Sequence, residues 1–398
     1  MKVSTLALLA VPATAFSQIF SPLSNLLSLT PQQDDISLIV TDDNSLPLKV
    51  TSADKFKLKR SGVNFIDITD HETWFWSQKD TPSKVPVYNY PTNVTSSEFV
   101  TDLIEEINKD NLRFNLAQFS SFFSRYYKSE NGLKSATWLF HKLTSIIEEA
   151  KQSNPDLQVS ISQFQHKWQQ FSIIVSVKGQ ETPDDIVVVG CHQDSTNLLF
   201  PTLLKAPGAD DDGSGVTTNL EALRILLSSS QFQPSNTMEF HFYSAEEGGL
   251  LGSMDIFRAY NEEGKKVVAM LQQDMTGYIQ KTLDNAVEEH VGVITDFVSP
   301  QLTQFVKLII DSYLAIPYHE TECGYACSDH SSALKNGYPS SFIIESEFKY
   351  TNPYIHSTGD TLDRLDFDHI REFVKLVLGY VGELKDHKFK VLGYNEVS

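Results

Sequence analysis

Cysteine is scarce in this chain. Only three cysteines occur among 398 residues. Three thiols cannot form a disulfide-dense scaffold. They also cannot supply four cysteine ligands to a zinc or iron–sulfur site within one chain. Both classes of protein are therefore excluded.

Positive charge is also in short supply. The chain carries 32 Lys and Arg against 51 Asp and Glu, a formal net charge of −19. Such a chain would be repelled by phosphates, so neither a nucleic acid nor an anionic membrane surface is expected as a partner. Apolar residues make up 41% of the chain and aromatic residues 11%, which is a globular and not a disordered composition.

Long apolar runs are missing as well. The mostly apolar stretch from Val3 to Ala15 follows Met1-Lys2 and is shorter than the ~20 residues needed to cross a bilayer. With small residues near its end, it predicts a secretory signal peptide over residues 1–18, and hence an extracellular protein. A short membrane anchor is the alternative. Asn93 opens a usable N-glycosylation sequon, which agrees with export.

Residues 19–84 differ in composition from the rest of the chain. They hold a basic patch, Lys55 to Arg60, ahead of an acidic body. This contrast predicts a removable pro-segment over residues 19–84 and a catalytic domain over residues 85–398. The alternative is a small N-terminal subdomain that stays attached. Several prolines predict a linker near residues 81–91, with the mature chain starting between Thr81 and Tyr88.

Strands and helices alternate from Ser96 onward. Strands are expected over 157–165, 171–177, 186–191, 238–243, 267–271 and 342–344, and helices over 99–107, 132–151, 213–229, 250–261, 300–314 and 367–385. This alternation predicts an α/β fold in which a mostly parallel, twisted central sheet carries helices on both faces. In such sheets the ligand site lies beyond the carboxyl ends of the strands.

Acidic and imidazole side chains collect at those strand ends. They are His192 and Asp194, Asp210-Asp211-Asp212, Glu246-Glu247, Asp274, and His356. Carboxylates brought this close would repel one another strongly unless a cation lay between them. Imidazole and carboxylate ligands without thiolate suit Zn²⁺, with Mn²⁺ or Co²⁺ as alternatives. The ligands are too many for one tetrahedral ion and fit a pair of ions about 3.5–4 Å apart.

Each motif also has a simpler explanation when it is taken alone. A run of aspartates commonly caps a helix, and a pair of glutamates is common in an exposed first turn. The occurrence of every cluster at a strand end favours the metal site. Other hydrolase signatures are missing, including H-E-x-x-H and G-x-S-x-G. Cys191 lies within an apolar run and is expected in the core, and Ser328-Asp329-His330 resembles a catalytic triad in letters only.

Five stretches carry a family resemblance. They are Cys191 to Ser195, Pro207 to Gly215, Ser244 to Ser253, Leu271 to Thr276, and Ile355 to Thr358. In these stretches the chain resembles the secreted two-zinc aminopeptidases of peptidase family M28, and most of all the fungal leucine aminopeptidases. The resemblance runs from Ser96 to the C-terminus and implies a zinc-exopeptidase fold of the phosphorylase/hydrolase-like type.

The resemblance also implies roles for individual residues. Asp211 would bridge two Zn²⁺ ions, His192 and Asp274 would complete one site, Glu247 and His356 would complete the other, Glu246 would be the general base, and Asp194 would hydrogen-bond His192. The implied substrates are peptides with a free N-terminus, with leucine or another apolar residue first. The implied enzyme is a monomer whose pro-segment aids folding and holds activity down.

The surroundings of the site follow from the same resemblance. Cys323 and Cys327 would form a short disulfide, and Tyr325 would face the substrate. Met275, Phe348 and Ile355 would line a pocket for the first side chain, although they are equally compatible with the core. Three other functions stay open: a carboxypeptidase, a one-zinc glutaminyl cyclase, and an inactive peptidase-like binding protein.

Overall fold

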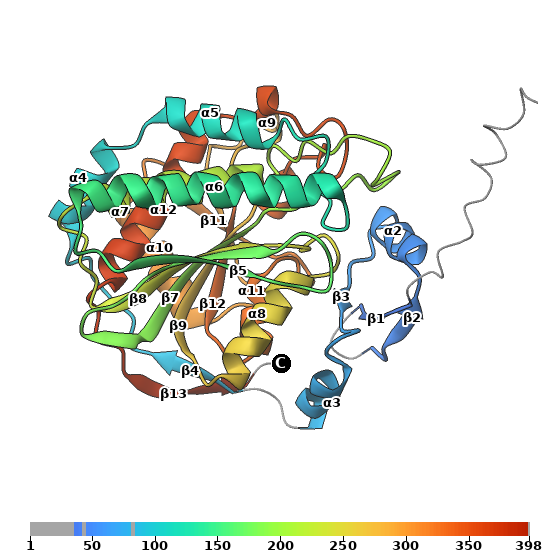
Figure 1. The fold of residues 1–398 in the computed structure, drawn as a ribbon, viewed down its shortest axis with the longest axis horizontal. Coiled ribbons are helices and arrows are strands. Elements are labelled where there is room, and N and C mark those ends of the chain that lie inside the picture. The colour runs from blue at the N-terminus through green and yellow to red at the C-terminus, as the bar shows by residue number, and fades with distance from the viewer. Residues whose placement is uncertain (1–35, 42–44, 81–83, 397–398) are drawn as a thin grey trace, which may run out of the picture.

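The computed structural model describes residues 36–41, 45–80 and 84–396 (Figure 1). The predicted signal peptide and the first part of the predicted pro-segment lie outside these residues. Residues 81–83, which belong to the predicted linker, also lie outside them. Within the described ranges, no helix is long and apolar enough to cross a bilayer.

An eight-stranded sheet forms the centre of the molecule. Its strands, in order across the sheet, are β11 (Tyr318–Thr321), β10 (Val291–Ile294), β12 (Ser340–Ile344), β9 (Lys266–Gln273), β7 (Thr182–His192), β8 (Asn236–Tyr243), β6 (Ser172–Val177) and β5 (Val159–Phe164). The middle strands β12, β9, β7 and β8 are parallel, whereas β10, β6 and β5 bring in antiparallel pairs. The predicted α/β fold is confirmed, and the sheet is mixed toward its edges.

Helices cover both faces of this sheet (Figure 1). One face carries α4 (Ser97–Glu105), α5 (Lys109–Phe119), α6 (Glu130–Ser153), α7 (Gly213–Ser228), α10 (Pro300–Tyr313) and α12 (Phe367–Leu384), and the other carries α8 (Leu251–Glu262) and α11 (His330–Lys335). Strand β7 contributes side chains to the cores on both faces of the sheet, because successive side chains of a strand point to opposite faces. Val187 and Val189 enter the larger core cluster, and Ile186 and Val188 enter the smaller one.

The parallel middle strands end at the same edge of the sheet. β7 ends at His192, β8 ends just before Ser244, and β9 ends just before Asp274. Helix α7 begins at Gly213, and the carboxylate of Asp212 caps it by accepting the backbone N–H of Gly215 at 3.0 Å. The fold therefore delivers the predicted site motifs to one place.

Residues 36–41 and 45–80, here called the N-terminal segment, lie beside that edge (Figure 1). The segment contains β1 (Ser37–Val40), β2 (Leu48–Val50) and β3 (Ile66–Asp67) in one small sheet, with helices α2 (Ser52–Arg60) and α3 (Glu72–Asp80). Its apolar residues Ile66, Ile68 and Trp74 pack against Leu250 and Met254 of the catalytic body. The segment is thus attached by a buried apolar contact.

The linker predicted near residues 81–91 is wrong in part, because some of these residues form a paired strand. Strand β4 (Lys84–Tyr88) pairs with the last strand, β13 (Val391–Glu396), and Pro86 lies opposite Tyr394. Proline is tolerated there because a two-stranded sheet consists of edge strands, where a missing N–H costs little. The chain therefore joins the catalytic body from Lys84 onward.

Candidate metal centre and substrate pocket

The carboxylate of Asp211 lies between two histidines. Its Oδ1 is 3.0 Å from Nε2 of His192, and its Oδ2 is 3.0 Å from Nε2 of His356. His192 ends β7, while His356 lies in a distant loop before α12. One carboxylate therefore faces two separate ligand groups with different oxygens, which is the arrangement that a bridging metal ligand requires.

The two groups are completed by further carboxylates. Asp274 Oδ1 lies 3.4 Å from His192 Nε2, and Glu247 Oε1 lies 3.1 Å from His356 Nε2. The hydroxyl of Ser328 donates to the other oxygen of Asp274 at 2.7 Å and holds that side chain in place. The predicted ligand residues are thus brought together as two groups that share Asp211.

These ligand atoms fit a pair of cations. His192 Nε2, Glu247 Oε1 and Asp274 Oδ1 are buried and have no hydrogen-bond partner. Burial alone would lower the pKa of His356, yet the charges of Glu247 and Asp211 raise it to about 10. Burial would likewise lower the pKa of His192, and Asp274 and other carboxylates raise it well above its ordinary value. The site thus favours positive charge in both groups, which divalent cations would supply.

Asp212 also lies close to His192 and Asp274, and by distance these three could hold a metal ion. Its oxygens are already used, however. They accept the backbone N–H groups of His192 at 3.1 Å, Gly215 at 3.0 Å and Met275 at 3.1 Å. Asp212 therefore ties the ligand-bearing loops together, and Asp211 is the better metal ligand.

Asp194 is buried and connects His192 to the glutamate pair. Its Oδ1 lies 3.5 Å from Nδ1 of His192, an ion-pair distance. Its two oxygens accept the backbone N–H groups of Glu246 at 3.0 Å and Glu247 at 3.2 Å. Sequence reasoning predicted a hydrogen bond to His192, where the structure has this ion-pair contact and no hydrogen bond. It did not predict the pair of bonds that fixes the glutamate loop.

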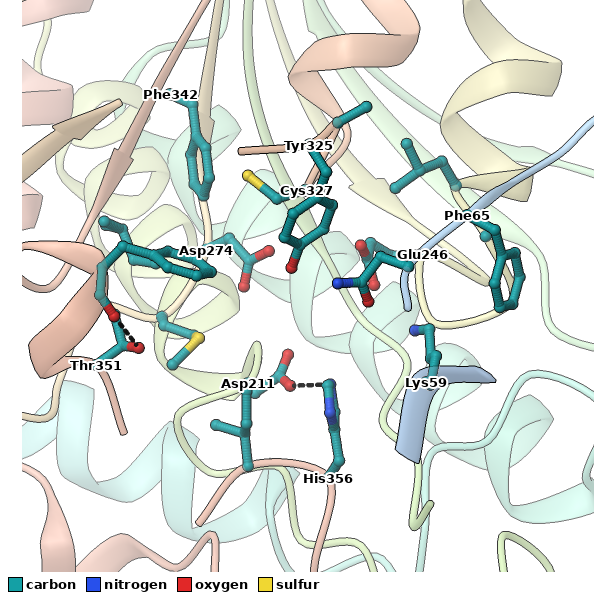
Figure 2. Close-up of a pocket in the computed structure, with 18 residues that line it drawn as sticks. Lys59, Phe65, Asp211, Glu246, Asp274, Tyr325, Cys327, Phe342, Thr351 and His356 are labelled. Atoms are coloured by element: carbon teal, nitrogen blue, oxygen red, sulfur yellow. Dashed lines mark hydrogen bonds and ion pairs between the residues drawn. The ribbon is translucent and has the colours of Figure 1, made fainter. Parts of the chain in front are cut away.

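Glu246 lines a cavity next to the two ligand groups (Figure 2). Burial raises the pKa of this carboxyl well above its ordinary value, and the charges of Lys59 and His192 only partly offset that rise. Tyr325 lines the same cavity, and burial together with the nearby Glu246 raises the pKa of its phenol. Tyr325 is therefore a neutral hydrogen-bond donor at ordinary pH.

The cavity has an apolar side, here called the first-residue pocket. It is lined by Met275, Phe342, Ile344, Phe348 and Ile355. The predicted pocket residues all line it, and Phe342 and Ile344 from β12 were not anticipated. Cys323 and Cys327 are joined by a disulfide, and the sulfur-bearing loop packs on this apolar cluster. Cys191 is a buried free thiol, as predicted.

Arg125 is a buried residue that sequence reasoning missed. Its guanidinium donates to the backbone carbonyls of Gln193 at 2.8 Å and Gly208 at 2.8 Å, and also to that of Pro207. The ring of Phe119 lies beneath it, 4.4 Å from the guanidinium carbon. Arg125 therefore supports the loop that carries Asp211, and its side chain is fully buried and does not line the cavity.

Lys59 is a second residue that was missed in this role. It lies in α2, far along the chain from the ligand motifs, and its Nζ is 2.8 Å from Oε2 of Glu247. Helix α2 is fixed at its start by a capping box, in which Thr51 and Asp54 each accept the other's backbone N–H. The basic patch that marked the segment contains Lys59, but no sequence pattern pairs it with Glu247.

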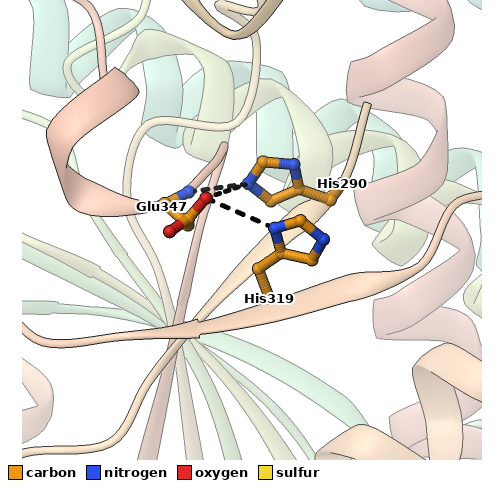
Figure 3. Close-up of side chains that lie close together, drawn as sticks. All are labelled: His290, His319 and Glu347. Atoms are coloured by element: carbon orange, nitrogen blue, oxygen red, sulfur yellow. Dashed lines mark hydrogen bonds and ion pairs between the residues drawn. The ribbon is translucent and has the colours of Figure 1, made fainter. Parts of the chain in front are cut away.

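A third cluster, His290, His319 and Glu347, lies apart from the cavity (Figure 3). The two imidazole rings stack with centroids 3.9 Å apart. Nδ1 of His290 donates to the carbonyl of Glu288 at 2.7 Å, and its Nε2 accepts the backbone N–H of Glu347 at 2.9 Å. Both nitrogens of His290 are therefore used within the protein, and this cluster is a structural contact.

Comparison with known proteins places these features in a family context. Residues 172–381 match the model of "Peptidase family M28". A Saccharomyces cerevisiae protein named "Probable aminopeptidase" is 53% identical over 343 residues, which are 85% of this chain and 89% of the relative. "Leucine aminopeptidase 1" of Leptosphaeria maculans is 48% identical over 369 residues, 90% of this chain and 93% of the relative.

Solved structures agree with the fold. The LapA aminopeptidase of Legionella pneumophila superposes with a TM-score of 0.77 at 26% identity, covering 89% of this chain and 99% of that protein. The glutaminyl cyclase of Porphyromonas gingivalis superposes with a TM-score of 0.54 at 20% identity, covering 70% and 99%. The second likeness extends to the fold alone.

Proposed function

Because the chain belongs to peptidase family M28 and is an aminopeptidase, we propose that it removes apolar N-terminal residues, leucine above all, with the help of two Zn²⁺ ions and a glutamate base. The observation that carries this proposal is the placement of Asp211 between His192 and His356. A carboxylate that turns one oxygen toward each ligand group can bind two ions at once. A single ion would not require this arrangement.

The ligands divide between the two ions in a definite way. His192 and Asp274 would hold one ion, Glu247 and His356 the other, and Asp211 both. When bound, such a pair lowers the pKa of a shared water so that hydroxide is available near neutral pH. Asp194 and Asp212 keep the ligand loops in register by accepting their backbone N–H groups.

Glu246 is the proposed general base. Glu246 lines the cavity, and its backbone N–H donates to Oδ1 of Asp194 at 3.0 Å. It can accept a proton from the attacking water and return it to the leaving amine. Tyr325, neutral and across the cavity, can donate a hydrogen bond to the substrate carbonyl as negative charge develops there.

The first-residue pocket supports the proposed preference for apolar residues. Its aliphatic, aromatic and thioether side chains favour a buried apolar side chain, worth roughly 1.5–3 kcal/mol for a leucine. A carboxypeptidase would instead need an arginine to clamp the substrate carboxylate. Arg125 cannot serve because its donors bind backbone carbonyls. Among the described residues, no arginine lines the cavity.

The proposal extends to processing. We take residues 1–18 as an export signal and residues 19–84 as a removable pro-segment, and Asn93 as a glycan acceptor on the exported, monomeric enzyme. Asn93 is exposed in the structure. The N-terminal segment lies against the site through Lys59, so its removal should release activity.

A comparison of two substrates tests the activity. Leucyl-p-nitroanilide should be cleaved by the processed, zinc-loaded protein, and N-acetyl-leucyl-p-nitroanilide should not be cleaved. A chelator should abolish the first reaction. Equal cleavage of the acetylated substrate would contradict an exopeptidase that recognises a free N-terminus, and cyclisation of N-terminal glutamine would favour the cyclase alternative.

A further inference from the structure

Among the described residues, the N-terminal segment borders the cavity beside Gly249. Figure 2 shows Lys59 and Phe65 together on one side, with Phe342 on the opposite side and Asp211 between them. The segment residues that line the cavity are Lys59, Asn64 and Phe65. A bound peptide would therefore compete with the segment for this part of the cavity.

Lys59 reaches the glutamate pair. Its Nζ pairs with Oε2 of Glu247, whereas Oε1 of the same carboxylate faces His356. The ammonium therefore lies beside the glutamate pair, which includes the proposed base Glu246, and leaves the ligand oxygen of Glu247 free.

Phe65 and β3 cover the surface next to Lys59. The backbone N–H of Asp67 donates to the carbonyl of Gly249 at 3.0 Å. Gly249 has φ +107°, and a Cβ built on it would come within 3.0 Å of the Phe65 ring, so the segment and the loop at Gly249 are in close contact. The side chain of Lys55 donates to the carbonyl of Gly248 at 3.2 Å, which adds a second tie to the same loop.

The described part of the N-terminal segment does not enter the apolar side of the cavity. The cavity as a whole encloses about 680 Å³ without protein atoms, part of it open to solvent. The apolar cluster that contains Met275, Phe342, Ile344, Phe348 and Ile355 has no described member from the N-terminal segment.

We propose that the N-terminal segment occupies the surface that binds the leaving part of a peptide substrate, while the first-residue pocket stays accessible. This inference rests on the proposed function, since it takes the pocket as the place of the first side chain. The scissile bond then lies near Glu246, and the chain beyond it runs over Gly248 to Leu250, where Phe65 now packs. That surface should accept an apolar or aromatic residue from the substrate.

Two probes separate the two sides. L-leucine fills the first-residue pocket alone, whereas the tripeptide Leu-Gly-Phe needs both sides. Their binding is measured by calorimetry to the zinc-loaded Glu246→Ala protein, which prevents turnover, with and without the residues before Lys84. Lys59→Ala and Phe65→Ala are then added in the uncleaved chain. Lys57→Ala is the matched control, since Lys57 lies exposed on the same helix.

The expected results differ between the probes. Leucine should bind both forms with nearly equal affinity. Leu-Gly-Phe should bind the uncleaved chain at least about tenfold more weakly, a loss of ~1.4 kcal/mol. Lys59→Ala and Phe65→Ala should restore part of that affinity, and Lys57→Ala should not.

Three outcomes would overturn the inference. Equal loss of leucine and peptide binding would mean that the segment closes the whole site. Tight peptide binding to the uncleaved chain would mean that the segment does not cover the leaving side. If the processed protein binds neither probe, the proposed function fails as well. The two failures can be told apart because the processed protein lacks the segment, so its binding tests the proposed function alone.

Discussion

Nζ of Lys59 lies 2.8 Å from Oε2 of Glu247, so a cation from the N-terminal segment touches a carboxylate of the proposed metal centre. The two residues are 188 positions apart in the chain. Whether the segment is docked or removed should therefore affect the proposed metal centre.

Removal of the N-terminal segment should raise activity. Cutting the chain before Lys84 should increase kcat/KM for leucyl peptides because Lys59 and Phe65 no longer line the cavity. The rise is measured by steady-state kinetics on the same preparation before and after limited proteolysis. Unchanged kinetics after complete cleavage and release of the segment would contradict this account.

Glu246→Gln should abolish turnover and leave the metal in place. The amide keeps the size of the side chain but cannot accept the proton of the water, so kcat should fall by roughly 10²–10⁴. Zinc content should be unchanged, because the ligand atoms belong to other residues. Glu105→Gln, an exposed glutamate, is the control. Near-normal turnover would refute the role of Glu246.

Asp360 should act as a positioning residue for Asp211. Its two oxygens accept the backbone N–H groups of Asp210 at 3.0 Å and Asp211 at 3.1 Å. Asp360→Asn turns one acceptor into a donor that faces an N–H, so zinc affinity should fall by about 10–100-fold. Competition with a chromogenic chelator measures this affinity. Asp363→Asn is the exposed control, and an equal effect there would refute the assignment.

Docking of the N-terminal segment should weaken in acid through Asp255. Asp255 Oδ1 lies 2.9 Å from Nε2 of His71 in the segment, and Oδ2 lies 2.7 Å from Nδ1 of His166 in the body. Burial would raise the pKa of Asp255, but the hydrogen bonds and charges of His166 and His71 outweigh it and lower the pKa. The contact therefore contributes fully above the ordinary pKa, and its contribution is lost as the pH falls through the lowered value.

Asp255→Asn should reproduce this loss at neutral pH. The nicked segment should dissociate more readily, by ~1 kcal/mol, and the acid dependence of its release should flatten. Size-exclusion chromatography across pH after nicking measures the bound fraction. Asp70→Asn removes the solvent-exposed pair with Lys167 and should change little. An unaltered pH profile in Asp255→Asn would show that another group controls docking.

Local patterns in the sequence predicted most of the fold. The long helices α6, α7, α10 and α12 bury broad apolar stripes, strands β7 and β9 contain continuous apolar runs, and β8 alternates apolar with polar residues, so each carries a strong local signal. Strands β10 and β11 have four residues each and were not predicted, because so short a run resembles a loop. Helix α5 was missed for a related reason, since its mixed polar sequence gives a weak stripe.

The site was predictable where its residues follow strands. His192, Glu246, Glu247 and Asp274 meet because parallel strands end at one edge of the sheet. The contacts of Lys59, Arg125 and Asp360 depend on how loops fold back over that edge. No spacing along the chain encodes these contacts, so only the three-dimensional arrangement shows them.

A zinc titration of the processed, chelator-stripped enzyme tests the central claim most directly. The initial rate of leucyl-p-nitroanilide hydrolysis is followed as Zn²⁺ is added in known ratio to protein. The shared position of Asp211 predicts that activity reaches its plateau at about two equivalents of zinc per chain. A plateau at one equivalent, or no hydrolysis at any ratio, would contradict the two-ion aminopeptidase proposed for this chain.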